Sequence, residues 1–283
     1  MECLELFIPR SPTQFVISTD TVQREALCCV VALAAGFGVG AANYVFERVG
    51  FQLCRALEAR GVVRRFVPTG GQFEEHPLSN VWAVGAPYIA LYYLIARFLW
   101  PGLSERMVVS FNLLEVWVFV WCAMVAHDAW FYSMHRLFHQ VKPLFRLVHQ
   151  RHHQNGSNVT VLGTAFGDAA DIGLCFVAFH GALGLALWLL PRWNLVGVVT
   201  LIAFEVATNI TGHCGYELPL WMHAAVTAGV GLTPMAATSK THYIHHLDPR
   251  YNKALYFTWC DRLAGSYRDK HRLIAGDAPE KAA

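Results

Sequence analysis

Long apolar runs recur along this sequence, and they restrict the chain to a helical membrane fold. Hydrophobic residues make up 55% of the 283 residues and charged residues only 15%, which is displaced from globular averages toward membrane proteins. A membrane helix needs about 20 predominantly apolar residues, and it satisfies its backbone hydrogen bonds within the segment. We therefore expect an all-α integral membrane protein with about five apolar helical segments, at residues 26–46, 81–100, 107–126, 169–190 and 195–211.

These segments divide the chain into three expected parts. Residues 1–106 form an N-terminal membrane region with a basic loop at 47–79, residues 107–270 form a histidine-rich domain, and residues 271–283 form a tail. The glycines of the stretch GFGVG (Gly36–Gly40) lie inside an apolar run with no preceding strand. We interpret them as positions of close helix packing rather than as a nucleotide-binding loop.

Lysine and arginine are distributed unevenly between the loops, which predicts an orientation. Loop 47–79 carries five, the segment 135–168 carries four and the tail after residue 212 carries eight, whereas the loops on the other side carry four. Cytosolic loops of membrane proteins are enriched in these residues. We therefore predict that all three basic segments are cytosolic.

Charge and cysteine content exclude some classes of function. A net charge of +2 is too small to argue for nucleic-acid binding. The eight cysteines form no C-x-x-C pair and several lie in apolar runs, so they predict buried hydrophobic positions rather than disulfides or a zinc–thiolate site.

Histidines are concentrated in three short motifs, HRLFH, HQRHH and HYIHH. Their eight histidines are His135, His139, His149, His152, His153, His242, His245 and His246. Residues three and four apart are neighbours on a helix surface, so we expect the imidazoles of each motif to share one helix face. A structural zinc takes about four ligands and a catalytic zinc about three, so eight histidines predict two metal ions. Imidazole suits zinc, copper, nickel or iron, and the ligand type does not choose between them.

Two redox-active metal ions at a membrane surface suggest oxidation of a lipid. Activated oxygen can remove hydrogen from an unactivated C–H bond, which no side chain does alone and which a cofactor must therefore supply. A scaffold or metal-storage protein is the alternative from a different class, but a role in binding alone would not need so many ligands.

The three motifs, separated by apolar helices, resemble the fatty acid hydroxylase or sterol desaturase superfamily of histidine-box di-iron membrane oxidases. The resemblance covers roughly residues 111–268. The segment HCGYELP (His213–Pro219) is similar to a segment of sterol methyl oxidases and cholesterol 25-hydroxylase. The segment NKALYFTWCDRLAGSY (252–267) resembles the closing segment of the superfamily, with Lys253 and Ala254 in place of Tyr and Gly.

This resemblance implies a histidine-rich helical cap on the cytosolic side, with residues 107–270 as the catalytic domain. It implies two iron ions, O2, and electrons from NAD(P)H delivered through a cytochrome b type carrier and its reductase. It implies residence in the endoplasmic reticulum. The ligands that it implies are the eight histidines of the motifs together with His213.

The resemblance leaves three functions open. The first is a lipid hydroxylase (monooxygenase) acting on a sterol or related lipid in lipid biosynthesis, and the segment HCGYELP favours a sterol over a fatty acyl chain. The second is a sterol or fatty-acyl desaturase with the same di-iron centre, in which the histidines would look alike. The third is the non-catalytic metal-binding scaffold.

Two residues outside the motifs are candidates for supporting roles. Asp128 falls on the same helical stripe as His135 and His139, so it could accept an N–H bond from a ligand imidazole, or it could form an ion pair with an arginine. Asn209 lies one turn before His213, at a place where the similar sphingolipid hydroxylases have another histidine, and could ligate a metal ion through oxygen or hold a water molecule.

Four further polar residues lie in or near apolar segments, and the neighbouring sequence suggests a role for each. His223 could add a further ligand, whereas His127 and His180 are expected to pack or to line a substrate site. Glu205 lies within an apolar segment, where an ionisable residue is functional or paired by default.

Overall fold

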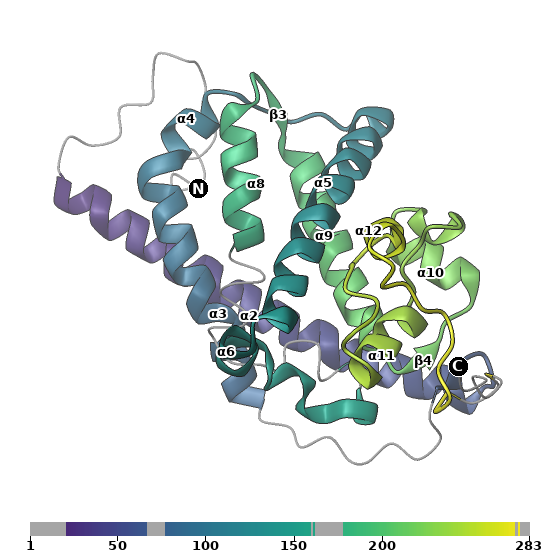
Figure 1. The fold of residues 1–283 in the computed structure, drawn as a ribbon. Coiled ribbons are helices and arrows are strands. Elements are labelled where there is room, and N and C mark those ends of the chain that lie inside the picture. Colours follow the sequence, from purple (N-terminus) through teal and green to yellow (C-terminus); the bar gives the residue numbers. More distant parts are fainter. Residues whose placement is uncertain (1–20, 67–76, 160, 162–177, 275–276, 278–283) are drawn as a thin grey trace.

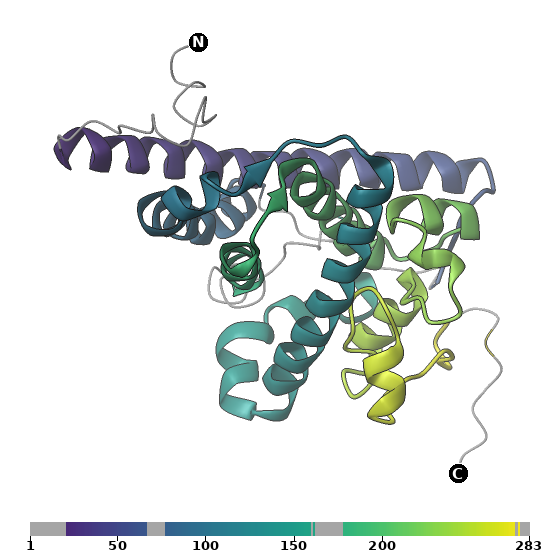
Figure 2. The same ribbon diagram turned by 90° about the horizontal axis from the view of Figure 1, so that it is seen from above.

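The computed structural model describes residues 21–66, 77–159, 161, 178–274 and 277. Within them the fold is a helical bundle with short helices gathered beside the ends of α5 and α9 (Figure 1). The longer helices are α2 (Thr21–Ala59), α3 (Pro77–Leu94), α5 (Leu113–Gln140), α8 (Ala178–Leu189) and α9 (Leu195–Gly212). The shorter ones are α4 (Trp100–Ser104), α6 (Lys142–Leu144), α10 (Leu220–Val226), α11 (Ser239–Leu247) and α12 (Trp259–Leu263). Seen from above, α2 runs the full width of the molecule with the other helices on one side of it (Figure 2).

Irregular helical turns and very short strands complete the described fold. Two π-helical turns span Ile95–Leu99 and Phe145–His149, and two 3-10 helices span His152–Asn158 and Val230–Leu232. Strand β1 (Arg64–Arg65) pairs antiparallel with β4 (Tyr216–Glu217). Strand β2 (Met107–Val108) pairs parallel with β3 (Trp193–Asn194). Because each described strand has only two residues, the fold still belongs to the all-α class.

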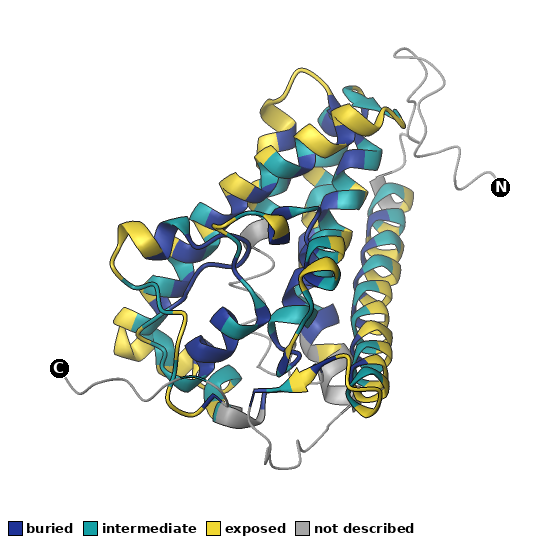
Figure 3. Cartoon of the chain, turned by 90° about the vertical axis from the view of Figure 1, so that its right-hand side faces the viewer, coloured by how far each residue is buried: buried dark blue, intermediate teal, exposed yellow. Residues whose placement is uncertain are grey.

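Three of the described helices are long and apolar enough to cross a membrane. They cover Gln23–Ala59, Leu113–Gln140 and Leu195–Gly212, and a shorter apolar helix covers His180–Leu189. Large apolar side chains point outward on these helices, for example Val30 and Phe46 on α2 and Leu114 on α5. Exposed positions follow the whole length of α2 (Figure 3). An apolar outer surface of this extent fits a lipid environment, and the helical membrane fold is confirmed.

The predicted boundaries need correction at α2. The first segment was expected to end at residue 46 and give way to a loop, but α2 continues to Ala59. Its end is a paired capping motif: Gly61 takes a positive φ of 69°, the Val62 N–H donates to the Leu57 carbonyl and the Gly61 N–H donates to the Glu58 carbonyl, each at 2.9 Å. A left-handed glycine with these two bonds closes a helix, so the break falls at Gly61 rather than at the change in hydropathy.

The predicted start and end of α5 also need correction. The segment was expected at 107–126, but Met107 and Val108 form strand β2 and the helix begins at Leu113. The Asn112 side chain caps it by accepting from the backbone N–H groups of Leu114 and Glu115. The helix then continues through residue 126 to Gln140. The membrane segment and the motif HRLFH therefore form one continuous helix.

The other predicted segments agree in position. Residues 81–100 lie in α3 and the turns that follow it, and residues 195–211 lie in α9. The segment 169–190 is represented by α8, because residues 169–177 lie outside the described part of the chain. The two apolar helices α8 and α9 follow one another in the chain and are joined by the short strand β3.

The glycine stretch of α2 marks the crossing with α3. A Cβ atom placed on Gly36 would lie 2.4 Å from Ile89 Cγ1 and 2.9 Å from the Gly85 carbonyl oxygen. A Cβ atom on Gly38 would meet nothing within 4 Å. The packing interpretation is thus confirmed at Gly36, where only glycine allows the two backbones to approach.

We predict that Gly36→Ala destabilises the protein and that Gly38→Ala does not. The methyl group at Gly36 meets backbone atoms that cannot rotate away, and such overpacking costs about 1–3 kcal/mol. At Gly38 the same change adds only the small helix preference of alanine, about 1 kcal/mol or less. The apparent melting temperature of each variant, purified in detergent, measures the difference. Equal melting temperatures for the two variants would contradict the close crossing.

Candidate metal centre

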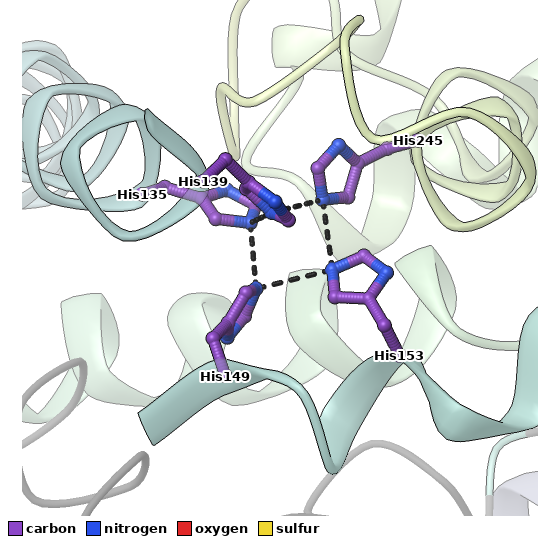
Figure 4. A group of neighbouring side chains, drawn as sticks. All are labelled: His135, His139, His149, His153 and His245. Atoms are coloured by element: carbon purple, nitrogen blue, oxygen red, sulfur yellow. Dashed lines mark hydrogen bonds between the residues drawn. The ribbon is translucent and has the colours of Figure 1, made fainter. Parts of the chain in front are cut away.

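Nine histidines from four parts of the chain gather in two adjacent groups. The first group consists of His135, His139, His149, His153 and His245, and the second of His152, His213, His242 and His246. In each group the ligand atoms all lie within 4.8 Å of one another. Figure 4 shows the imidazoles of the first group turned toward a common centre.

The Nε2 atoms of the first group form a closed ring of short separations. His135 lies 3.0 Å from His149, His149 lies 3.1 Å from His153, and His153 lies 3.2 Å from His245. His139 closes the ring at 3.2 Å from both His245 and His135. The five side chains come from three segments, namely α5, the turns at residues 145–158 and α11, so the fold and not one motif creates the ring.

These separations fit a bound metal ion. Nitrogen–metal bonds of about 2.1 Å at right angles place neighbouring nitrogens about 3.0 Å apart, whereas a tetrahedral arrangement places them nearer to about 3.4 Å. The observed range of 3.0–3.2 Å is closer to the right-angled case. Five nitrogens at this spacing exceed the four of a structural zinc site.

The second group has the same spacing with four histidines. The Nε2 atom of His213 lies 3.1 Å from that of His152 and 3.0 Å from that of His242, and His246 lies 3.2 Å from His242. The residues present therefore fit two metal ions, one in each group, as the histidine count predicts.

The partition of each motif between the two groups differs from the expectation. In HQRHH, His149 and His153 belong to the first group and His152 to the second, and in HYIHH, His245 belongs to the first group and His242 and His246 to the second. Adjacent residues on a helix point about 100° apart, so neighbouring histidines of one motif diverge. Each triplet spans both metal sites instead of offering one face to a single ion.

Backbone carbonyl groups fix the orientation of three ligands. The Nδ1–H of His135 donates to the Lys253 carbonyl at 2.7 Å, and that of His245 donates to the Tyr251 carbonyl at 2.8 Å. The Nδ1–H of His213 donates to a carbonyl of its own helix, that of Asn209, at 2.8 Å. Because a carbonyl can only accept, Nδ1 carries the proton and Nε2 presents a lone pair to the metal site.

Burial also keeps the ligands in the metal-binding form. It lowers the pKa of His213, His245 and His246 well below the usual histidine value, and the positive charge that neighbouring imidazoles would carry lowers it further. The same causes lower the pKa of His242 to about 3. These imidazoles are therefore neutral at pH 7, which is the state that binds a metal ion.

The expected contact of Asp128 with a ligand imidazole needs correction. The Asp128 Oδ1 atom instead accepts three backbone N–H bonds, from Leu255 at 3.0 Å, Tyr256 at 2.7 Å and Phe257 at 3.3 Å. The side chain of Asp128 is fully buried on α5. It contacts the loop at residues 255–257, and the sequence does not predict that this loop packs against α5. Asp128 thus positions the loop, and the ion pair with an arginine considered from the sequence is not among its described contacts.

A second aspartate, which the sequence did not single out, holds the same loop. The Asp261 carboxylate accepts from the backbone N–H groups of Lys253 at 3.0 Å and Ala254 at 2.9 Å. Lys253 in turn supplies the carbonyl that orients His135. Asp128 and Asp261 together fix residues 253–257 and, through them, one ligand of the first group.

Asn209 and His223 border a small polar cavity beside the second group. The cavity has a volume of about 10 Å³ and is lined in part by Thr208, Asn209, His213, His223 and His242. That volume is about what one water molecule requires. His223 donates from Nε2 to the Ala237 carbonyl at 2.8 Å, which leaves Nδ1 as an acceptor. Neither residue belongs to the two groups, and both lie where they would contact a water next to His213 or His242.

His127 and His180 lie outside both groups, as expected. His127 is buried, and its Nδ1 atom lies 3.0 Å from the Tyr256 hydroxyl oxygen. His180 is buried at the apolar cavity described below, 3.9 Å from the carboxylate of Glu205.

Similarity to known proteins agrees with this centre. The family model for fatty acid hydroxylase matches residues 119–266, slightly more than half of the chain, and this range contains all nine histidines. The chain belongs to the fatty acid hydroxylase family. It is 28% identical over 169 residues to methylsterol monooxygenase 1 of Gallus gallus, covering 53% of this chain and 48% of that protein.

Two further relatives carry related names. Cholesterol 25-hydroxylase of Mus musculus is 26% identical over 157 residues, covering 56% of this chain and 49% of that protein. Sphinganine C4-monooxygenase 1 of Arabidopsis thaliana is 29% identical over 152 residues, covering 51% of this chain and 52% of that protein. The chain thus spans about half the length of the curated relatives it matches. No solved structure matches it.

We predict that the two groups bind metal ions separately. His139→Ala removes a ligand of the first group and His213→Ala a ligand of the second, so each variant should retain about one of two ions per chain, since the other group keeps its full ligand set. Elemental analysis of the purified protein by mass spectrometry measures the metal content. His271→Ala, outside both groups, is the control and should retain both ions. Loss of both ions in each single variant would argue for one shared site.

We predict that Asp128→Ala lowers stability and metal content much more than Asp128→Asn. Alanine leaves three buried N–H groups without an acceptor, at about 1–3 kcal/mol for each unsatisfied group, and frees the loop that orients His135. Asparagine retains an oxygen that can accept these bonds. The melting temperature and bound metal of the two variants are the measurements. If alanine and asparagine behaved alike, the backbone contacts of Asp128 would not matter for the site.

Proposed function

We propose that this protein is an O2-dependent lipid hydroxylase, a monooxygenase that uses two iron ions. The observation that carries the proposal is the position of the histidine groups beside a large apolar cavity. The cavity has a volume of about 610 Å³, a size in the usual range of ligand pockets, and is lined by residues of α2, α3, α8, α9 and α10. A site for redox metals next to a lipid-sized apolar cavity suits oxidation of a C–H bond.

The cavity and the metal centre meet at α9. Asn209 and Thr211 line both the large cavity and the small polar cavity beside His213 and His242. A lipid in the large cavity would therefore end within reach of the second histidine group. The apolar walls would exclude water from the bound lipid, which protects a reactive centre from side reactions.

The nine histidines would hold the two iron ions, and these would supply the activation of O2 and the removal of hydrogen from the substrate. The chain itself would do three things. Its backbone carbonyls would orient the imidazoles, Asp128 and Asp261 would hold the loop that carries one of these carbonyls, and Asn209 would hold a water molecule at the small cavity.

Hydroxylation is favoured over desaturation by the relatives. The three proteins described above are named as two monooxygenases and one hydroxylase, so oxygen insertion is the reaction that we assign to this chain, with desaturation as the alternative. Two of the three names refer to sterols, which favours a sterol or related lipid as substrate. The full set of nine converging histidines, three of them oriented by backbone carbonyls, supports an enzyme over a non-catalytic scaffold.

We further propose that the histidine cap faces the cytosol of an endoplasmic reticulum membrane. The basic segments at 47–79, 135–168 and after 212 support this orientation. Electrons would then come from NAD(P)H through a cytochrome b type carrier and its reductase, both on the cytosolic side. Residues 107–270 would form the catalytic domain, between the N-terminal membrane region 1–106 and the tail 271–283.

We predict that cells expressing the wild type accumulate a lipid heavier by one oxygen atom, and that a double variant His245→Ala, His246→Ala abolishes it. The double variant removes one ligand from each histidine group, so neither ion is held fully. Mass spectrometry of total lipids, with a reductase system present, is the measurement. His271→Ala serves as the matched control and should give the wild-type profile.

The other outcomes of this experiment are informative. A lipid lighter by two hydrogen atoms would show that the reaction is desaturation rather than hydroxylation. Identical lipid profiles for the wild type and the double variant, under several lipid diets, would contradict the assignment of an enzyme.

A further inference from the structure

Three buried polar side chains meet at the wall of the apolar cavity. The Tyr88 hydroxyl oxygen lies 3.3 Å from Nδ1 of His180, and Nε2 of His180 lies 3.9 Å from Oε2 of Glu205. Their exposed fractions are 4%, 7% and 2%, and all three line the cavity of about 610 Å³. We call them the polar cluster.

The metal centre does not explain the polar cluster. None of its members belongs to either histidine group. Glu205 lies within α9, one of the helices apolar enough to cross a membrane. An ionisable residue at such a position is costly and is kept for a function, and a cavity with apolar walls and a few convergent polar groups is the usual form of a ligand site, where the polar groups fix the ligand's orientation.

The cluster lies at a fixed distance from the metal centre. Glu205, Asn209 and His213 follow one another at intervals of four residues on α9 and its C-terminal cap. Eight residues of α-helix span about 12 Å. Because Asn209 lines both cavities, the cavity extends along this stripe from the cluster to the second histidine group.

We propose that the polar cluster binds the hydroxyl group of the lipid substrate and thereby presents to the metal centre a carbon roughly 12 Å from that hydroxyl. This proposal rests on the proposed function and names its substrate class. The substrate is a long apolar molecule with a single uncharged hydroxyl at one end, such as a sterol oxidised in its side chain. A carbon adjacent to the hydroxyl stays near Glu205 and is not the one attacked.

The opposite orientation of the lipid is disfavoured by solvation. With its hydroxyl at the metal centre, the lipid would press its hydrocarbon end against the polar cluster. That contact would place hydrocarbon against the buried Glu205 carboxyl group, whose interaction with His180 at 3.9 Å is longer than a hydrogen bond, and burial of a polar group against hydrocarbon is unfavourable. A charged headgroup is disfavoured as well, because an ion in this apolar cavity has too few compensating groups.

The test is direct binding of radiolabelled 5α-cholestan-3β-ol to the purified protein in detergent, in competition with unlabelled 5α-cholestane, which lacks the hydroxyl. The wild type should prefer the hydroxylated sterol by about tenfold, the value of one good neutral hydrogen bond. Tyr88→Phe and Glu205→Leu should each reduce this preference severalfold while the affinity for 5α-cholestane stays the same. Val206→Ala, an apolar cavity residue on α9, is the control and should leave the preference unchanged.

The outcomes separate this proposal from the proposed function. Equal binding of the two compounds by the wild type, or a preference that survives both Tyr88→Phe and Glu205→Leu in correctly folded protein, would overturn the proposal. Product analysis adds a second criterion, since oxidation of a carbon next to the hydroxyl would overturn it while the protein remained a hydroxylase. A preference lost in both variants, without any oxidised product, would support the cluster and contradict the proposed function instead.

Discussion

The fold depends on holding imidazole nitrogens 3.0–3.2 Å apart inside a buried site. Lone pairs that converge in this way repel one another, so their burial without a bonding partner would be unfavourable. A metal ion turns the same arrangement into bonds, and metal binding then contributes to folding. The first group joins α5 to α11 and to the turns after α6, and the second joins α11 to the end of α9. The two ions would therefore tie the membrane helices to the cap.

The site could be predicted from the sequence to the extent that its signals are local. The spacing of His135 and His139 on a helix, and the two triplets, are short-range patterns, and His213 followed from a resemblance in the surrounding segment. The division of the triplets between two groups depends on where distant elements lie. The hydrogen-bond acceptors for His135 and His245 are backbone carbonyl groups. Every residue has such a group, so the sequence does not indicate which one accepts the bond. Asp128 was found as a candidate, but its actual partners are N–H groups more than a hundred residues away.

The fold shows the same limit at the ends of its helices. Hydropathy reports which residues can face lipid, and it located α9 and α3 well. It does not report where a helix stops, because the charged residues Glu47, Arg48 and Arg55 lower the hydropathy of this stretch without stopping the helix. The end of α2 is set by Gly61 and the start of α5 by Asn112. Both are short-range signals of known type, so these two boundaries were available in the sequence to a closer inspection of the capping residues.

The geometry of α9 connects the metal centre to the choice of substrate carbon. Hydroxylation and desaturation would share one set of histidines, and so would attack at one carbon or at another, so the ligands alone do not determine the product. The position of the lipid along the cavity determines which carbon reaches the metal centre. Glu205, Asn209 and His213 are fixed on a single helix, and a functional site built on a rigid element holds its distances more accurately than one built on loops. A polar cluster at one end of this stripe and a metal ligand at the other give the chain a defined length against which a lipid can be placed.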